Sequence, residues 1–90
     1  MYKYIIEFLG TLFLTFIVMY TNNWLAIGSA LAVVVLLGGP ISGGYFNPAI
    51  TMAGVAAGKL NTGDIVPYII SQMAGSLVAF ELIKVMKTIS

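Results

Sequence analysis

The amino-acid sequence predicts an all-α membrane protein with three transmembrane helices and one re-entrant half-helix. The 90-residue chain is 60% hydrophobic and only 8% charged, whereas soluble domains carry about 25% charged residues. The 51 residues between Glu7 and Lys59 contain no formal charge, and a membrane-spanning helix needs about 20 apolar residues. The chain is therefore too apolar for an ordinary soluble enzyme or binding domain, and we expect a multi-pass integral membrane protein.

Whole residue types are missing from the chain, and their absence excludes several kinds of site. The sequence has no cysteine and no histidine, which excludes disulfides, Cys/His zinc sites and Ser-His triads. Its three acidic residues are dispersed, and a net charge of +1 provides no nucleic-acid-binding surface. We expect no enzymatic activity, no cofactor, no bound metal and no nucleic-acid partner.

Three apolar segments are expected to cross the membrane, at residues 2–20, 24–39 and 65–83. Each is near the minimum length for a span. The first has no small-residue cleavage site after its long apolar run, so we interpret it as a span and not as a signal peptide. Aromatic residues are expected to mark the two membrane faces. One face has Tyr2, Tyr4 and Tyr68, and the other has Tyr20 and Trp24.

Residues 40–58 are expected to enter the membrane and return on the same side. Their first half is rich in glycine and proline, which disfavours a regular helix, yet the segment carries no charge. Asn47 is a favoured N-cap and Pro48 suits the first helical position, so a helix should run from there to Gly58. Ten residues span about 15 Å, which is half of the bilayer core. Asn47 should therefore lie near the midplane, at the positive end of a half-helix dipole.

Polar side chains in two of the spans are expected to support this segment. Glu7 and Thr11 share one stripe of the first span, and Gln72 lies in the third. An acid inside a membrane helix is costly and normally faces a cavity or the bundle interior. Three interpretations of Glu7 are open: a proton or ion site, a carboxylate that braces the re-entrant loop, and a side chain that reaches the membrane interface. We favour bracing for Glu7, Thr11 and Gln72.

Three motifs together resemble the aquaporin, or major intrinsic protein, family. The segment of residues 41–51, Ile-Ser-Gly-Gly-Tyr-Phe-Asn-Pro-Ala-Ile-Thr, is similar to the first NPA box of that family. Residues 7–11, Glu-Phe-Leu-Gly-Thr, resemble the acidic motif of its first helix, and residues 72–75, Gln-Met-Ala-Gly, resemble a motif of its third helix. The motifs occur in the family's order, and the resemblance implies a channel for water or small neutral solutes such as glycerol.

The resemblance also implies roles for individual residues. The NPA box consists of Asn47, Pro48 and Ala49, with Asn47 as the hydrogen-bond donor in the pore. The backbone carbonyls expected to accept hydrogen bonds from the solute are those of Gly43, Gly44 and Tyr45. By spacing from Asn47, the narrow filter corresponds to Ile27, Val35, Gly44 and Ile50. The family's filter normally contains an arginine, and this sequence has none.

The sequence resembles only one half of the family's usual chain, which has six spans and two boxes. We therefore expect a pore completed by a second copy in inverted orientation or by a separate second-half chain, within a larger oligomer. The lysines favour neither topology. Two are expected on each membrane face, Lys3 and Lys59 on one and Lys84 and Lys87 on the other.

Two other functions are compatible with parts of the sequence. The first is a small dual-topology, proton-coupled transporter that uses Glu7. The second is a non-conducting or lesion-forming membrane protein, including a truncated gene product. The transporter leaves the box at Asn47 unexplained, which is why we favour the channel.

Overall fold

All the regular secondary structure in the described part of the chain is helical. The computed structural model describes residues 1–89 and contains α1 (Tyr2–Thr21), α2 (Trp24–Ser42), α3 (Pro48–Ala56), the short 3₁₀ helix η1 (Thr62–Asp64) and α4 (Ile65–Ile89). Helices α1 and α2, and η1 together with α4, form three segments long and apolar enough to cross a membrane. The predicted fold class is confirmed, and the chain is a multi-pass integral membrane protein.

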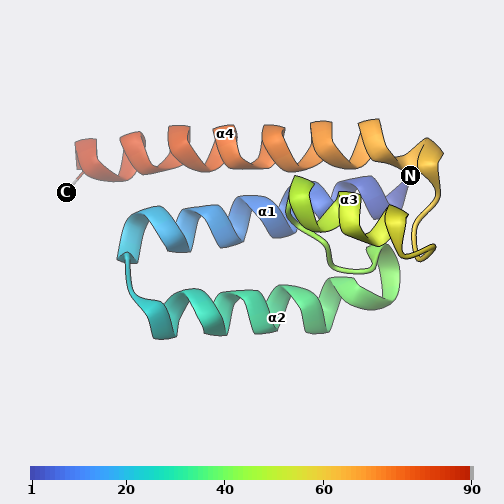
Figure 1. Ribbon diagram of the computed structural model, residues 1–90. Helices are drawn as coiled ribbons and strands as arrows, with labels where there is room; N and C mark the ends of the chain where they lie inside the picture. Colours follow the sequence, from blue (N-terminus) through green and yellow to red (C-terminus); the bar gives the residue numbers. More distant parts are fainter. Residues whose placement is uncertain (90) are drawn as a thin grey trace.

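Helix α1 lies at the centre and packs against both α2 and α4 (Figure 1). Helices α1 and α4 start at the same end of the molecule and run in the same direction, while α2 returns between them in sequence (Figure 1). The long axis of the molecule measures 45 Å. With an odd number of crossings, α4 ends at the opposite end from the start of α1, as three membrane spans require.

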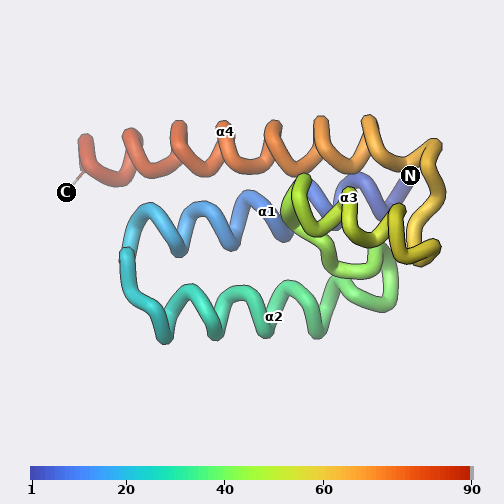
Figure 2. Tube along the Cα trace, in the orientation of Figure 1, coloured from blue at the N-terminus to red at the C-terminus, as the bar shows by residue number. Residues whose placement is uncertain are grey.

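Helix α3 is the re-entrant half-helix. The trace leaves α2 at the end of the molecule that contains the N-terminus, turns back toward the middle, and returns along α3 to the same end (Figure 2). The nine residues of α3 correspond to about 14 Å of helix, so it reaches only halfway through a bilayer core of about 30 Å. It packs against α4.

The second span is longer than predicted, because α2 continues through Pro40 to Ser42 and does not end at residue 39. A proline removes one backbone donor and clashes with the preceding turn. Pro40 has no N–H to donate to the Leu36 carbonyl, so the helix forfeits one hydrogen bond near its end. The helix stops at Gly43, which has φ 90° and donates its N–H to the Gly39 carbonyl at 2.8 Å.

Two further helix ends differ from the prediction. Helix α4 runs to Ile89 and not to residue 83, because Lys84 and its neighbours are good helix formers and Lys84 pairs with Glu81 at 3.0 Å. Helix α3 ends at Ala56, two residues before Gly58, which takes φ 74° in the turn that follows. A left-handed glycine just beyond the last turn is a common helix terminator.

Candidate functional site: the re-entrant loop and its supporting network

The carboxylate of Glu7 lies at the centre of a hydrogen-bond network around the loop of residues 43–47, hereafter the re-entrant loop. Glu7 is fully buried. Its Oε1 accepts hydrogen bonds from the Phe46 N–H at 2.7 Å and from Gln72 Nε2 at 2.8 Å. Its Oε2 accepts from the Ser42 hydroxyl at 2.6 Å and from the Tyr45 N–H at 3.2 Å. Four donors thus compensate a charge that would otherwise be costly inside a membrane protein.

The backbone of the re-entrant loop presents the N–H groups of Tyr45 and Phe46 to Glu7. Gly43, Gly44 and Phe46 have φ values of 90°, 69° and 53°, all in the left-handed region that glycine adopts readily. Successive backbone N–H groups in a turn can form a concave nest that binds anions. Here the bound anion is a side chain of the same protein.

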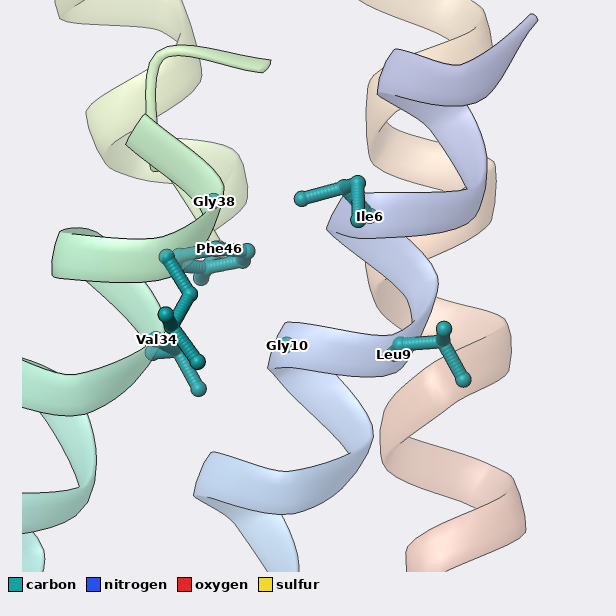
Figure 3. Close-up of a pocket in the computed structure, with 7 residues that line it drawn as sticks. Ile6, Leu9, Gly10, Val34, Gly38 and Phe46 are labelled. Atoms are coloured by element: carbon teal, nitrogen blue, oxygen red, sulfur yellow. The ribbon is translucent and has the colours of Figure 1, made fainter. Parts of the chain in front are cut away.

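Phe46 is the one residue of this loop that has a positive φ without being glycine, and its ring is wedged between two helices. The ring lies beside Gly10 of α1 and Gly38 of α2, where a side chain on Gly10 would overlap it and a Cβ on Gly38 would be 3.0 Å from it. The ring lines an apolar pocket of about 170 Å³ between α1 and α2, and Figure 3 shows the side chains around it. The close fit and the hydrogen bond to Glu7 hold a conformation that L-residues rarely adopt.

A second layer of hydrogen bonds connects Glu7 to the half-helix. Gln72, which is 1% exposed, also donates through Nε2 to the Thr51 hydroxyl at 2.7 Å. The Thr51 hydroxyl donates in turn to the Asn47 carbonyl at 2.8 Å. Three helices, α1, α4 and α3, are therefore joined through one polar path that ends at the N-cap of the half-helix.

The prediction that Thr11 also braces the loop is wrong. Its hydroxyl is buried and has no hydrogen-bond partner among residues 1–89, and the same holds for Oε1 of Gln72. Thr11 lies one turn beyond Glu7 on α1, and its side chain is shorter than that of Glu7. The longer Glu7 side chain reaches the loop alone.

Asn47 caps the half-helix with its side chain. Its Oδ1 accepts hydrogen bonds from the N–H groups of Ala49 at 2.7 Å and Ile50 at 3.4 Å, and Pro48 occupies the first turn. The cap uses only the amide oxygen, so the Nδ2 donors of the exposed Asn47 side chain are available to an external acceptor. Asn47 also lies at the positive end of the α3 dipole.

The carbonyl groups assigned to the pore are unpaired in the described part of the chain. No hydrogen bond from residues 1–89 reaches the carbonyl oxygens of Gly43, Gly44 or Tyr45. Backbone that leaves acceptors open at this depth is tolerated where it faces a water-filled space.

The four positions assigned to the filter fall into two groups. An added Cβ on Gly44 would be 3.5 Å from the Cα of Val35, so these two residues are neighbours. Ile50, in the first turn of α3, is 53% exposed, and Val35 is 41% exposed. Ile27 lies eight residues before Val35 on α2, about 12 Å along the helix.

Sequence reasoning missed three residues that contact the loop or its helix. Ser42 and Thr51 flank the box. The Ser42 hydroxyl donates to Glu7 and the Thr51 hydroxyl donates to the Asn47 carbonyl, roles that the sequence does not predict. Tyr68 is predicted to mark a membrane face, but it is 1% exposed and donates to the Ser42 carbonyl at 2.7 Å. Its position one turn before Gln72, on the same helix face, is the signal that could have revealed it.

Acidic side chains do not gather into a metal site in the described chain. No group of three or more His, Cys, Asp or Glu residues that could hold a metal ion occurs within residues 1–89.

Comparison with known proteins points to one family. The family model described as Major intrinsic protein matches residues 1–89. The chain is 39% identical over 93 residues to Glycerol uptake facilitator protein-like 6 of Lactiplantibacillus plantarum, covering 93% of this chain and 43% of that protein. It is 34% identical over 98 residues to Aquaporin Z of Bradyrhizobium diazoefficiens, covering 92% and 41%.

A mammalian relative matches a shorter stretch. Aquaporin-8 of Mus musculus is 46% identical over 61 residues, covering 68% of this chain and 23% of that protein. The chain therefore spans less than half the length of these relatives. No solved structure gives a significant match.

Proposed function

We propose, because the chain belongs to the major intrinsic protein family, that it is a channel subunit for the passive passage of water and small neutral solutes. One observation carries the proposal: the Glu7 network satisfies the buried side of the re-entrant loop, while Asn47 and three backbone carbonyls keep free hydrogen-bonding groups. The names of its relatives, a glycerol uptake facilitator and aquaporins, support the solute class. We expect no catalysed reaction.

The chemistry of these groups suits a neutral polar solute. Asn47 would donate hydrogen bonds at the membrane midplane, and the carbonyls of Gly43, Gly44 and Tyr45 would accept them. The positive end of the α3 dipole at Asn47 opposes the passage of cations and protons. The filter positions are apolar or lack a side chain, and no arginine narrows them, so glycerol should pass along with water.

The pore requires a second half-helix. Helix α3 reaches only halfway through the bilayer, and channels of inverted-repeat design place a second such element upside down. We propose that a second copy of the chain in inverted orientation supplies it; a separate second-half chain is the other source, and either pair could join a larger oligomer. The even division of four lysines between the two faces is compatible with both orientations.

Flux measurements on reconstituted protein test the function directly. Phosphatidylcholine vesicles containing only this chain should shrink faster than empty vesicles in a sucrose gradient. In a glycerol gradient they should shrink and then re-swell. Stopped-flow light scattering measures both changes in volume. Asn47→Asp should sharply reduce glycerol flux or admit cations, because a negative charge at the half-helix end opposes the dipole barrier. Parent vesicles as tight as empty ones would show that the chain alone forms no pore.

Fixing the orientation tests the inverted pair. Adding two lysines beside Lys3 should fix one topology, and adding them after Lys87 should fix the other. Each variant alone should be inactive, and the two expressed together should restore flux. Accessibility of a cysteine tag at the C-terminus reports the orientation. A parent chain that inserts in one orientation only would require a separate second-half chain.

The proton-coupled alternative receives no support from the surroundings of Glu7. Four donors from neighbouring structure occupy its two carboxylate oxygens and attach the side chain to the loop and to α4. Glycerol flux that is driven by a pH gradient and lost in Glu7→Gln would nevertheless favour the transporter.

A further inference from the structure

Tyr68 contacts the re-entrant loop at two separate places. Its hydroxyl donates to the Ser42 carbonyl at 2.7 Å, which is one of the last carbonyls of α2 and has no partner within its own helix. Its ring packs edge-on against the ring of Tyr45, with centroids 6.1 Å apart and an interplanar angle of 68°. A single buried side chain of α4 thus touches both the residue before the loop and the middle of the loop.

A second group of residues holds Tyr68 from the opposite side. Tyr4 of α1 packs edge-on against the Tyr68 ring, with centroids 5.8 Å apart at 88°. The Tyr4 hydroxyl donates to Oδ1 of Asp64 at 2.6 Å, and Lys3 Nζ lies 2.9 Å from Oδ2 of the same carboxylate. Asp64 is 6% exposed and lies in η1, where the chain returns from α3 to α4.

From these contacts we infer that Tyr68 is a positioning residue for the re-entrant loop and that Asp64 fixes Tyr68 through Tyr4. The inference rests on the proposed function, because it assigns Tyr68 an effect on the solute that passes. The carbonyls of Gly43 and Gly44 lie between its two points of contact, Ser42 and Tyr45. Any shift of the Tyr68 hydroxyl moves the place where the loop leaves α2, and with it the spacing of those carbonyls.

The Tyr68 contacts differ in kind from the bracing by Glu7. Glu7 binds the loop through N–H groups, whereas Tyr68 binds the carbonyl that precedes the loop. Removing the Tyr68 hydroxyl leaves the Glu7 bonds in place and abolishes one hydrogen bond to a buried carbonyl. The expected result is a loop that remains folded but is less strictly placed, with a filter that discriminates solutes less well.

Tyr68→Phe tests the inference with two independent measurements. Amide hydrogen exchange at Tyr45 and Phe46 should become about fivefold faster, as loss of one hydrogen bond implies, while exchange in the middle of α1 stays unchanged. The ratio of glycerol to water flux per assembled channel should rise. Tyr20→Phe, a matched change at an exposed tyrosine of α1, should alter neither quantity.

Tyr4→Phe tests the role of Asp64. It removes the bond to Asp64 without touching the loop, and it should speed the exchange of the same two amides by less than Tyr68→Phe does. Parental exchange in Tyr68→Phe, or an equal increase throughout α1 and α4, would overturn the inference. Faster loop exchange with an unchanged flux ratio in a conducting parent would overturn it as well. If the parent does not conduct, the proposed function fails, and the exchange measurements still decide whether Tyr68 positions the loop.

Discussion

Replacement of Glu7 by glutamine should loosen the re-entrant loop more than any other single change of similar size. Glutamine has almost the same shape as glutamate but carries no charge, and one of its two terminal atoms is a donor. In the parent, both carboxylate oxygens accept hydrogen bonds, two at Oε1 and two at Oε2. The variant therefore keeps the packing and changes only the hydrogen bonds and the charge.

The magnitude can be worked out bond by bond. Hydrogen bonds to charged groups contribute about 1.5–3 kcal/mol and neutral ones about 0.5–1.5 kcal/mol, so the two bonds at Oε1 weaken by about 2 kcal/mol together. The NH₂ group of glutamine then takes the place of Oε2. There the Tyr45 N–H faces a donor and loses its partner, which costs about 1–3 kcal/mol more, whereas the Ser42 hydroxyl can rotate to accept a hydrogen bond. A neutral amide is less costly to bury than a carboxylate, which offsets part of the loss. We expect a net destabilisation of about 3 kcal/mol, a large part of the roughly 5–15 kcal/mol typical of a domain.

Unfolding of the purified protein in detergent measures this change, with amide exchange at Tyr45 and Phe46 as a local reporter. The matched control is Glu81→Gln, which removes an exposed carboxylate whose ion pair with Lys84 is worth less than about 1 kcal/mol. A Glu7→Gln protein as stable as the Glu81→Gln protein, with protected loop amides, would refute the claim that Glu7 holds the loop.

Two further substitutions test helix packing and the filter. Gly75→Ala should destabilise the protein by about 1–3 kcal/mol, because the new Cβ would lie 2.5 Å from the backbone oxygen of Phe8. The control Gly28→Ala, with no atom within 4 Å of its Cβ, should be neutral or stabilising by up to about 1 kcal/mol. Equal unfolding midpoints for the two variants would contradict this. Ile50→Arg should lower glycerol flux more than water flux, because a long cationic side chain narrows the opening; equal reductions measured on vesicles would argue against a place for Ile50 in the filter.

Much of the fold can be predicted because membrane spans are encoded locally. Length and hydropathy locate the three spans, and the pair Asn47-Pro48 locates the start of the half-helix to the residue. A lone carboxylate in an apolar span has few ways to be satisfied inside a bilayer. The bracing role of Glu7 can therefore be predicted from its place in the first span and from the unpaired backbone of the glycine-rich segment.

The remaining features depend on tertiary register, which the sequence does not state. Tyr68 and Tyr4 are both aromatic residues near the same membrane face, but only the position of α4 against α1 decides that Tyr68 is buried and Tyr4 bonded to Asp64. Thr11 lies on the same stripe as Glu7, yet the short reach of its side chain leaves it without a partner among residues 1–89. Pro40 lies inside α2 and not beyond its end, although a proline there removes one backbone hydrogen bond.

The hydrogen bonds that support the re-entrant loop lie in one half of the molecule, and the geometry gives a reason. Helix α3 and the loop occupy only the half that contains the N-terminus (Figure 1), so that is where backbone groups lack regular partners. Glu7 is placed about one and a half turns into α1, at the depth where it can receive the N–H groups of Tyr45 and Phe46. The N–H groups of Tyr45 and Phe46 are thereby satisfied from within the protein, and the carbonyls of Gly43, Gly44 and Tyr45 are left open. A loop with three open carbonyls presents acceptors to whatever passes, and we expect the proposed pore to favour solutes that can donate hydrogen bonds.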